Sequence, residues 1–374
     1  MRKLPAMIKS RLFYLTALFL LFNPGRGASI LVSDIKLSGL FDTNAALTRS
    51  SQVKIIPKSD YASSLSVGLS RNNPFSLYDS LSIDYRFDTT EFRELKKQNA
   101  RKHLLDIKYQ KSISQKSTLV PAFEIEYNDE DARDWSYSRY NPSLLFTYFS
   151  GRGIISEIFY EWDNKQFLDN KARNNYNSIG SNSHKLDTRF KLWHNSFLRS
   201  TLNYNYNYEI FEQNIAPTLQ YARLLPGFTR DDTTHSIRFE EMIVFSESLL
   251  GNLIFERRAN QSNSDPNTYS ANQFGANIIF EPFPSNTLFI EYNYTGYDYY
   301  KNQFDRRYIN TREDFQTGLF AAYQLEISRQ VSIELKYSFT NNDSNDTIDF
   351  NPVFTKIYSS YSRTIFNLSL KVYL

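Results

Sequence analysis

Apolar and polar residues alternate one by one along most of the chain from residue 30 onward. The segment TLNYNYNYEIF, residues 201–211, shows this clearly: aliphatic and aromatic residues stand at the even positions, and asparagine or glutamate at 203–209 on the odd ones. Side chains of a strand point alternately to opposite faces, so each such segment has one apolar and one polar face. The pattern predicts an all-β protein.

The alternation predicts sixteen strands. Their ranges are 31–41, 60–70, 80–88, 102–111, 117–127, 139–149, 154–164, 183–194, 198–210, 233–245, 249–258, 270–281, 286–298, 312–325, 330–340 and 358–373. Fourteen or eighteen strands are the alternatives, because Glu241 interrupts the alternation in 233–245 and one pair of strands is open to a second interpretation.

The predicted connections alternate in length, and the aromatic residues gather near both ends of the strands. Connections after even strands are short, whereas those after odd strands, such as 42–59, 165–182 and 211–232, are long and polar. Tyr206 and Tyr208 stand late on an outward-running strand, and Tyr148 and Tyr323 late on strands that run back. Short turns on one side, long loops on the other and two aromatic belts favour a transmembrane antiparallel up-and-down β-barrel over a soluble sandwich.

Composition is compatible with such a barrel. Aromatic residues make up 16% of the 374 residues, yet the mean hydropathy is −0.50. A helical membrane protein would be more apolar, whereas barrel strands are only half lipid-facing. The chain has no cysteine, which mildly favours a fold closed by hydrogen bonds over a disulfide-bonded exported domain.

Residues 1–27 read as a cleaved signal peptide, which leaves 28–374 as a single barrel domain. A basic start precedes an apolar stretch over 12–22, which is too short to span a bilayer. The segment 1–27 holds five of the 43 basic residues and no acidic one, so 38 basic residues remain against 40 acidic ones. With a mature net charge near −2, nothing indicates nucleic-acid binding.

The last strand resembles the C-terminal targeting strand of bacterial outer-membrane proteins. Its apolar residues alternate to the very end: Phe366, Leu368, Leu370, Val372 and Leu374. The family usually ends in Phe, whereas this chain ends in Leu. The segments LSGLFDTN (37–44) and YSFTNNDSN (337–345) are also similar to stretches in porin-like barrels. The resemblance implies insertion into the outer membrane by the barrel-assembly machinery, with lipid and lipopolysaccharide around the wall.

A barrel of sixteen strands is too wide for side chains to fill, so we expect a water-filled lumen. The charged residues on the polar faces are its predicted lining: Asp84, Arg86, Lys108, Glu124, Glu126, Glu157, Glu161, Asp187, Arg189, Lys191, Glu209, Glu256, Glu291, Glu334, Lys336 and Lys371. Phe149, Phe159, Trp193 and Phe211 are expected to face inward as well. Such charges select ions, or else only pair along the wall.

Loop 211–232 is the longest and contains the cluster Arg230, Asp231 and Asp232, so it is the candidate for a constriction, with an outward surface loop as the alternative. Asp231, Asp232 and His235 could suggest a hydrolytic group, but no nucleophile is spaced with them. The acidic segments 128–131 and 343–346 lack the pattern of a helix-loop-helix calcium site. We therefore expect no enzyme activity, no cofactor and no metal.

These observations predict a porin-like channel of the bacterial outer membrane for passive diffusion of small hydrophilic solutes or ions. The alternative is an occluded barrel that acts as a surface adhesin, a structural protein or an export and assembly partner. A homotrimer is compatible with the pattern, because the apolar wall that trimeric porins bury would resemble a lipid-facing one. The pattern does not identify a solute.

Overall fold

The computed structural model describes residues 30–43, 59–76, 79–96, 99–130, 136–151, 153–167, 180–211, 230–263, 268–299, 312–344 and 361–374. They form sixteen strands: β1 (Ile30–Asp42), β2 (Asp60–Pro74), β3 (Asp79–Phe92), β4 (Ala100–Ser114), β5 (Ser117–Glu130), β6 (Tyr137–Phe149), β7 (Ile154–Phe167), β8 (Ser181–Trp193), β9 (Leu198–Phe211), β10 (Arg230–Ser246), β11 (Leu249–Ser262), β12 (Tyr269–Phe283), β13 (Asn286–Tyr299), β14 (Arg312–Ser328), β15 (Val331–Ser344) and β16 (Tyr361–Tyr373). The predicted signal peptide, 1–27, lies outside the described residues.

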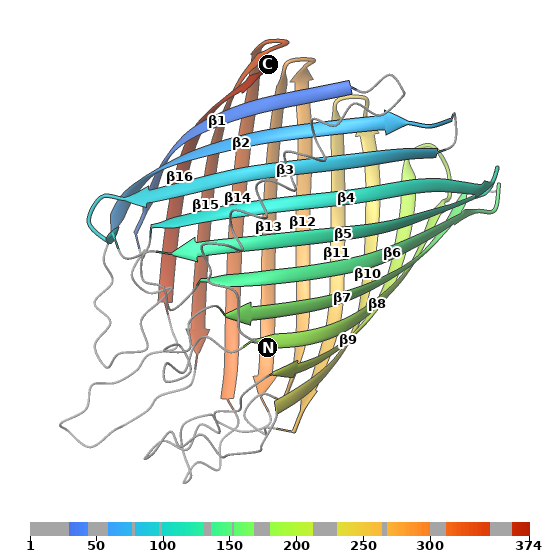
Figure 1. Ribbon diagram of the computed structural model, residues 1–374. Helices are drawn as coiled ribbons and strands as arrows, with labels where there is room; N and C mark the ends of the chain where they lie inside the picture. Colours follow the sequence, from blue (N-terminus) through green and yellow to red (C-terminus); the bar gives the residue numbers. More distant parts are fainter. Residues whose placement is uncertain are drawn as a thin grey trace, which may run out of the picture.

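Each strand pairs antiparallel with its neighbours in the sequence, and the sheet closes on itself (Figure 1). Closure is made by β1 and β16, which pair from Asp34 opposite Tyr373 to Asp42 opposite Ile365. Because every strand has two neighbours, the barrel has no free edge. The predicted fold class, an all-β antiparallel up-and-down barrel of sixteen strands, is confirmed.

Several strands are longer than the alternation predicted. β3 continues to Phe92 where 80–88 was predicted, and β10 begins at Arg230 rather than at 233. Most of the added residues are polar on both faces, as in Thr89-Thr90-Glu91. We attribute the extension to strand ends that stay hydrogen-bonded beyond the apolar band, where both faces meet water and the alternation no longer shows.

The connections keep the predicted asymmetry in length. After even strands they are 75–78, 115–116, 150–153, 194–197, 247–248, 284–285 and 329–330, and after odd strands they include 43–59, 168–180, 212–229 and 345–360. In the short turn between β6 and β7, Gly151 and Gly153 have φ of 82° and 73°. Residues with a Cβ rarely adopt this left-handed conformation, so glycine suits both positions.

The apolar side chains face outward, opposite to the arrangement in a soluble protein. Leu202, Phe274 and Leu368 are 48%, 55% and 57% exposed, whereas Ile83 and Leu105 are among the few buried apolar side chains in the described residues. Contiguous exposed apolar surface of this extent marks a surface covered by another apolar phase. In a closed barrel, that surface is the outer wall facing lipid.

Three histidines lie on the outer face, each beside a tyrosine of the preceding strand. Tyr85 and His103 Nδ1 are 2.9 Å apart, and Tyr160–His184 and Tyr204–His235 are each 2.8 Å apart, measured from the hydroxyl oxygen. In all three, the tyrosine belongs to Tyr-x-aromatic and the histidine to His-x-Leu or His-x-Ile on the paired strand. The same tyrosine–histidine hydrogen bond therefore recurs three times in the aromatic belt near the long-loop end.

Glu241, which interrupts the pattern in β10, also lies on the outer face. Its carboxylate accepts a hydrogen bond of 2.7 Å from the hydroxyl of Ser200 on β9. This polar contact, near the short-turn end of the strand, accounts for a glutamate among outward apolar residues. β10 pairs with the whole length of β9, so Glu241 does not interrupt the strand. In the described segments, no helix has the length and apolar character needed to cross a membrane.

Candidate functional site in the barrel lumen

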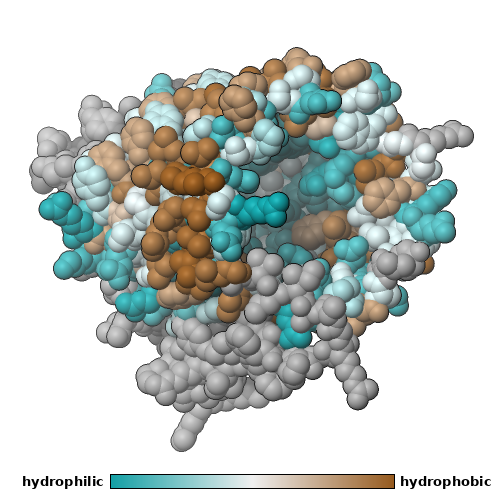
Figure 2. Space-filling view, turned by 90° about the horizontal axis from the view of Figure 1, so that it is seen from above, coloured by the Kyte–Doolittle hydropathy of each residue, from teal (hydrophilic) through white to brown (hydrophobic). Residues whose placement is uncertain are grey.

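The polar faces of the strands line a hollow (Figure 2). All sixteen charged residues of the predicted lining lie on this inward face. Along each strand they alternate with the outward apolar residues, and across the sheet they lie in the same rows as residues that surround two cavities in the lumen. Their placement follows from strand geometry alone; any role in permeation does not.

One cavity of about 450 Å³ lies against β1, β2, β3, β14, β15 and β16, on both sides of the closing seam. Most of its basic and acidic residues pair directly. Lys36 Nζ and Lys336 Nζ are each 2.7 Å from a carboxylate oxygen of Glu334, and Lys371 Nζ is 3.4 Å from Asp34. Because these contacts join β1, β15 and β16, they support barrel closure from the inside.

The second cavity, of about 610 Å³, lies against β7 to β12 on the opposite side of the barrel. Hydrogen-bonding side chains dominate its lining, with Asn203, Asn205 and Asn207 of β9 in one line along the strand. Amides both donate and accept hydrogen bonds. The asparagines of this wall can therefore contact water or polar solutes, beside charged residues of both signs.

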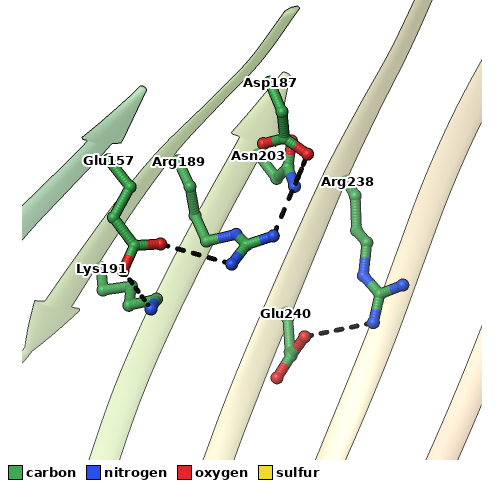
Figure 3. A network of polar contacts seen from close by, with 7 residues as sticks. All are labelled: Glu157, Asp187, Arg189, Lys191, Asn203, Arg238 and Glu240. Atoms are coloured by element: carbon green, nitrogen blue, oxygen red, sulfur yellow. Dashed lines mark hydrogen bonds and ion pairs between the residues drawn. The ribbon is translucent and has the colours of Figure 1, made fainter. Parts of the chain in front are cut away.

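Polar contacts lie on this second wall in two separate groups (Figure 3). Glu157 of β7 lies 3.3 Å from Arg189 Nη1 and 2.8 Å from Lys191 Nζ, and Asn203 Nδ2 donates to Asp187 over 3.3 Å. On β10, Arg238 Nη2 is 3.2 Å from Glu240. Solvated pairs of this kind contribute little stability each, but they keep long side chains against the wall and out of the central space.

The four large aromatic residues predicted to face inward also share the inward side of their strands. Three of them lie under cations: Lys185 Nζ is 5.8 Å from the ring centre of Phe159, Arg199 is 5.4 Å from that of Trp193, and Arg230 is 4.3 Å from that of Phe211. They therefore act as platforms for neighbouring charges. No regular ladder of rings is formed by these residues.

Sequence reasoning missed several charged residues of the lining. They are Asp34, Lys36, Asp42, Asp88, Lys102, Asp106, Arg139, Asp163, Lys185, Arg238, Arg258 and Arg363. Most of them stand an even number of positions from a predicted lining residue on the same strand, as Asp106 does from Lys108, and so point to the same side. Strict application of the two-residue period along each whole strand would have found them.

The loop cluster considered for a constriction or a hydrolytic site is divided by the structure. Arg230, Asp231 and Asp232 belong to β10 rather than to a loop, while 212–229 lie outside the described residues. Asp232 faces the lumen and pairs with Arg230, whereas Asp231 and His235 are on the outer face. The three groups therefore do not converge. In the part of the chain that the structure describes, no three His, Cys, Asp or Glu side chains are arranged to hold a metal ion.

Comparison with solved structures gives the same architecture. The protein OmpT of the outer membrane of Vibrio cholerae superimposes with a TM-score of 0.51 at 8% identity, over 95% of this chain and 100% of that one. An anion-selective porin from Comamonas acidovorans gives 0.50 at 9% identity, over 93% and 99%, and a bacterial polysaccharide outer-membrane secretin gives 0.50 at 8%, over 91% and 98%.

The fold is that of a porin-like outer-membrane β-barrel. At identities of 8–9%, the likeness concerns the fold alone. No protein-family model and no curated protein sequence matches the chain. Since one barrel architecture serves both an anion-selective porin and a polysaccharide secretin, function has to be argued from the lumen of this chain.

Proposed function

We propose that this protein is a channel of the bacterial outer membrane, through which small hydrophilic solutes or ions diffuse passively. The observation that carries the proposal is the division between the two faces of the wall: apolar and aromatic side chains outside, and ion pairs, amides and hydroxyls inside. Such an interior needs water or other polar groups inside the barrel. The cavities of about 450 and 610 Å³ against this wall give water room.

The proposal includes no cofactor and no catalytic role. Export by a cleaved signal peptide at 1–27 and insertion by the barrel-assembly machinery through the terminal strand Phe366 to Leu374 are parts of the same proposal. Assembly as a homotrimer is one as well. Native mass spectrometry in detergent tests the trimer.

Conductance of single channels in planar bilayers tests the proposal. The refolded barrel should produce stable current steps, while protein left unfolded in the same detergent should produce none. Asn205→Trp places a large ring on the inward face, and Tyr204→Trp places one on the outward face of the same strand. The first should lower the step size and the second should leave it unchanged.

Silent bilayers with a barrel that is folded by circular dichroism would contradict the channel and favour the occluded barrel with a surface or export role. Equal effects of the two tryptophan variants would show that current does not pass through the lumen.

A further inference from the structure

Carboxylates on neighbouring strands form a row across the inward wall. Asp84 of β3 lies directly opposite Asp106 of β4, and Asp106 lies directly opposite Glu124 of β5. Residues in such positions have their Cβ atoms about 4.5–5.5 Å apart, and like charges directly opposite each other are destabilising. Three adjacent acids therefore oppose the stability of the sheet, which suggests a role other than structural.

The row continues with the same sign around half of the barrel. Asn141 of β6 lies opposite Glu124, and the register of β6 and β7 brings Asp163 beside Asn141. Further pairs extend the row to β10: Asp163 with Ser183, Ser183 with Glu209, and Glu209 with Asp232. From β3 to β10 it contains carboxylates, one amide and one hydroxyl, and no basic residue.

The row rises along the lumen. Asp84 lies in the half of β3 (Asp79–Phe92) nearer the short turns, whereas Asp232 is close to the start of β10 (Arg230–Ser246) at the long-loop end. Strands of a closed barrel tilt by about 35–45° from its axis, so a row perpendicular to the strands climbs the wall. The carboxylates thus follow an oblique line along the inner wall, from the long-loop end of the barrel to its middle.

Most carboxylates of the row have a direct partner at their side. Lys108 pairs with Asp106, and Ser70 donates to Asp84. Arg139 Nε donates to Asp163 over 2.8 Å, and Arg230 Nε donates to Asp232 over 3.0 Å. Their bases come from neighbouring positions along the strands, so the row itself stays acidic.

Glu124 and Asn141 differ from the rest. Among the described residues, Glu124 makes no hydrogen bond and no ion pair closer than 4 Å. Asn141 is only 9% exposed, and its side-chain oxygen Oδ1 is buried without a hydrogen-bond partner. A buried acceptor without a donor is costly and rare in native proteins. Glu124 is only partly buried and is influenced by the charges of Arg139 and Lys102 without contacting them. Its carboxylate, the buried amide oxygen of Asn141 and Asp106 lie side by side, so together they offer a place for a positive or hydrogen-donating species.

We propose that this carboxylate row is the path of cations through the lumen, and that Glu124 and Asn141 are the point on it where a cation is held. Carboxylate and amide oxygens are the ligands that Na⁺, K⁺, Mg²⁺ and Ca²⁺ take in proteins. The row does not close into a metal cage, so the ion keeps part of its water. Weak sites in series allow an ion to enter and to leave, which conduction requires.

The inference rests on the proposed channel function and specifies its substrate class. Reversal potentials in planar bilayers under a KCl gradient test it, on wild type, Glu124→Gln, Asn141→Asp and the control Glu247→Gln. Glu247 lies in the short turn between β10 and β11, outside the row, so this control removes the same charge elsewhere. Each variant is first shown to fold by circular dichroism and by the shift of its band on unheated gels.

The wild type should prefer K⁺ over Cl⁻. Glu124→Gln should lower the K⁺ to Cl⁻ permeability ratio by about two- to fivefold, the size expected for one unit charge a few ångströms from an ion in water, and Asn141→Asp should raise it. Glu247→Gln should leave it unchanged. A conducting but anion-preferring wild type, or equal shifts in Glu124→Gln and the control, would overturn the cation path and leave the channel intact. A folded barrel without conductance would overturn both.

Discussion

The opposite faces of β9 allow the same substitution to be compared in lipid and in water. Leu202 faces outward and is 48% exposed, whereas Asn205, three residues later, faces the lumen opposite Asp187 and Ser236. Arginine at position 202 must place its charge against the hydrocarbon. Arginine at position 205 meets water and the carboxylate of Asp187. We therefore expect Leu202→Arg to destabilise the barrel and Asn205→Arg to be tolerated.

The expected loss of stability in Leu202→Arg is the sum of two contributions. An arginine on the lipid face of a barrel costs about 2–4 kcal/mol near the bilayer midplane. Loss of the leucine contact adds about 1 kcal/mol, because roughly half of a transfer free energy of about 1.5–3 kcal/mol is at stake for a half-exposed side chain. Leu202→Arg should thus lower the free energy of unfolding by about 3–5 kcal/mol, and Asn205→Arg by less than about 1 kcal/mol.

Equilibrium unfolding in guanidinium chloride measures both, with the barrel inserted in phospholipid vesicles and followed by tryptophan fluorescence. The predicted difference of at least about 2 kcal/mol corresponds to a change in the folding equilibrium of at least about thirtyfold. Equal losses in the two variants, or a larger loss for Asn205→Arg, would refute the assignment of the two faces.

Three further variants test individual contacts. Asp42→Asn removes the carboxylate that accepts from Arg363 Nε over 3.1 Å at the closing seam, and it should cost about 1–3 kcal/mol, visible as a lower denaturant midpoint; an unchanged midpoint would show that this pair does not support closure. His235→Phe keeps a ring in the aromatic belt but loses the hydrogen bond with Tyr204, so stability should fall by about 1 kcal/mol with unchanged channel conductance, and a changed conductance would contradict a purely outer position. Gly153→Ala should cost about 1–2 kcal/mol in the same titration, because φ is 73° and a Cβ would lie 3.3 Å from Trp193; a neutral result would mean that the turn relaxes.

The fold could be predicted from the chain because the relevant signal is local. Alternation over residues 201–211 already assigns each side chain to a face, and repetition of that pattern gives the number of strands. Strand ends were less predictable. At Arg230 to Asp232, both faces are wetted, so the pattern disappears while the hydrogen-bonded ladder continues.

The arrangement of the lumen could be predicted only in part. Parity places Asp84, Asp106 and Glu124 on the inward face, but their alignment in one row depends on the stagger between strands, which no single strand encodes. The same holds for Glu334, whose partner Lys36 stands at the other end of the sequence and reaches it only after closure. Pairing across the seam is a property of the closed sheet.

The central claim is that the wall is one closed sheet with lipid outside and water inside, and alternate-residue labelling tests it most directly. The chain has no cysteine, so single cysteines can be introduced at positions 203, 204, 205 and 206 of β9 and treated with a water-soluble maleimide in vesicles. The account predicts fast labelling at 203 and 205 and slow labelling at 204 and 206. With a lipid-soluble maleimide, the order of the rates should be reversed. Similar reactivity at all four positions would contradict it.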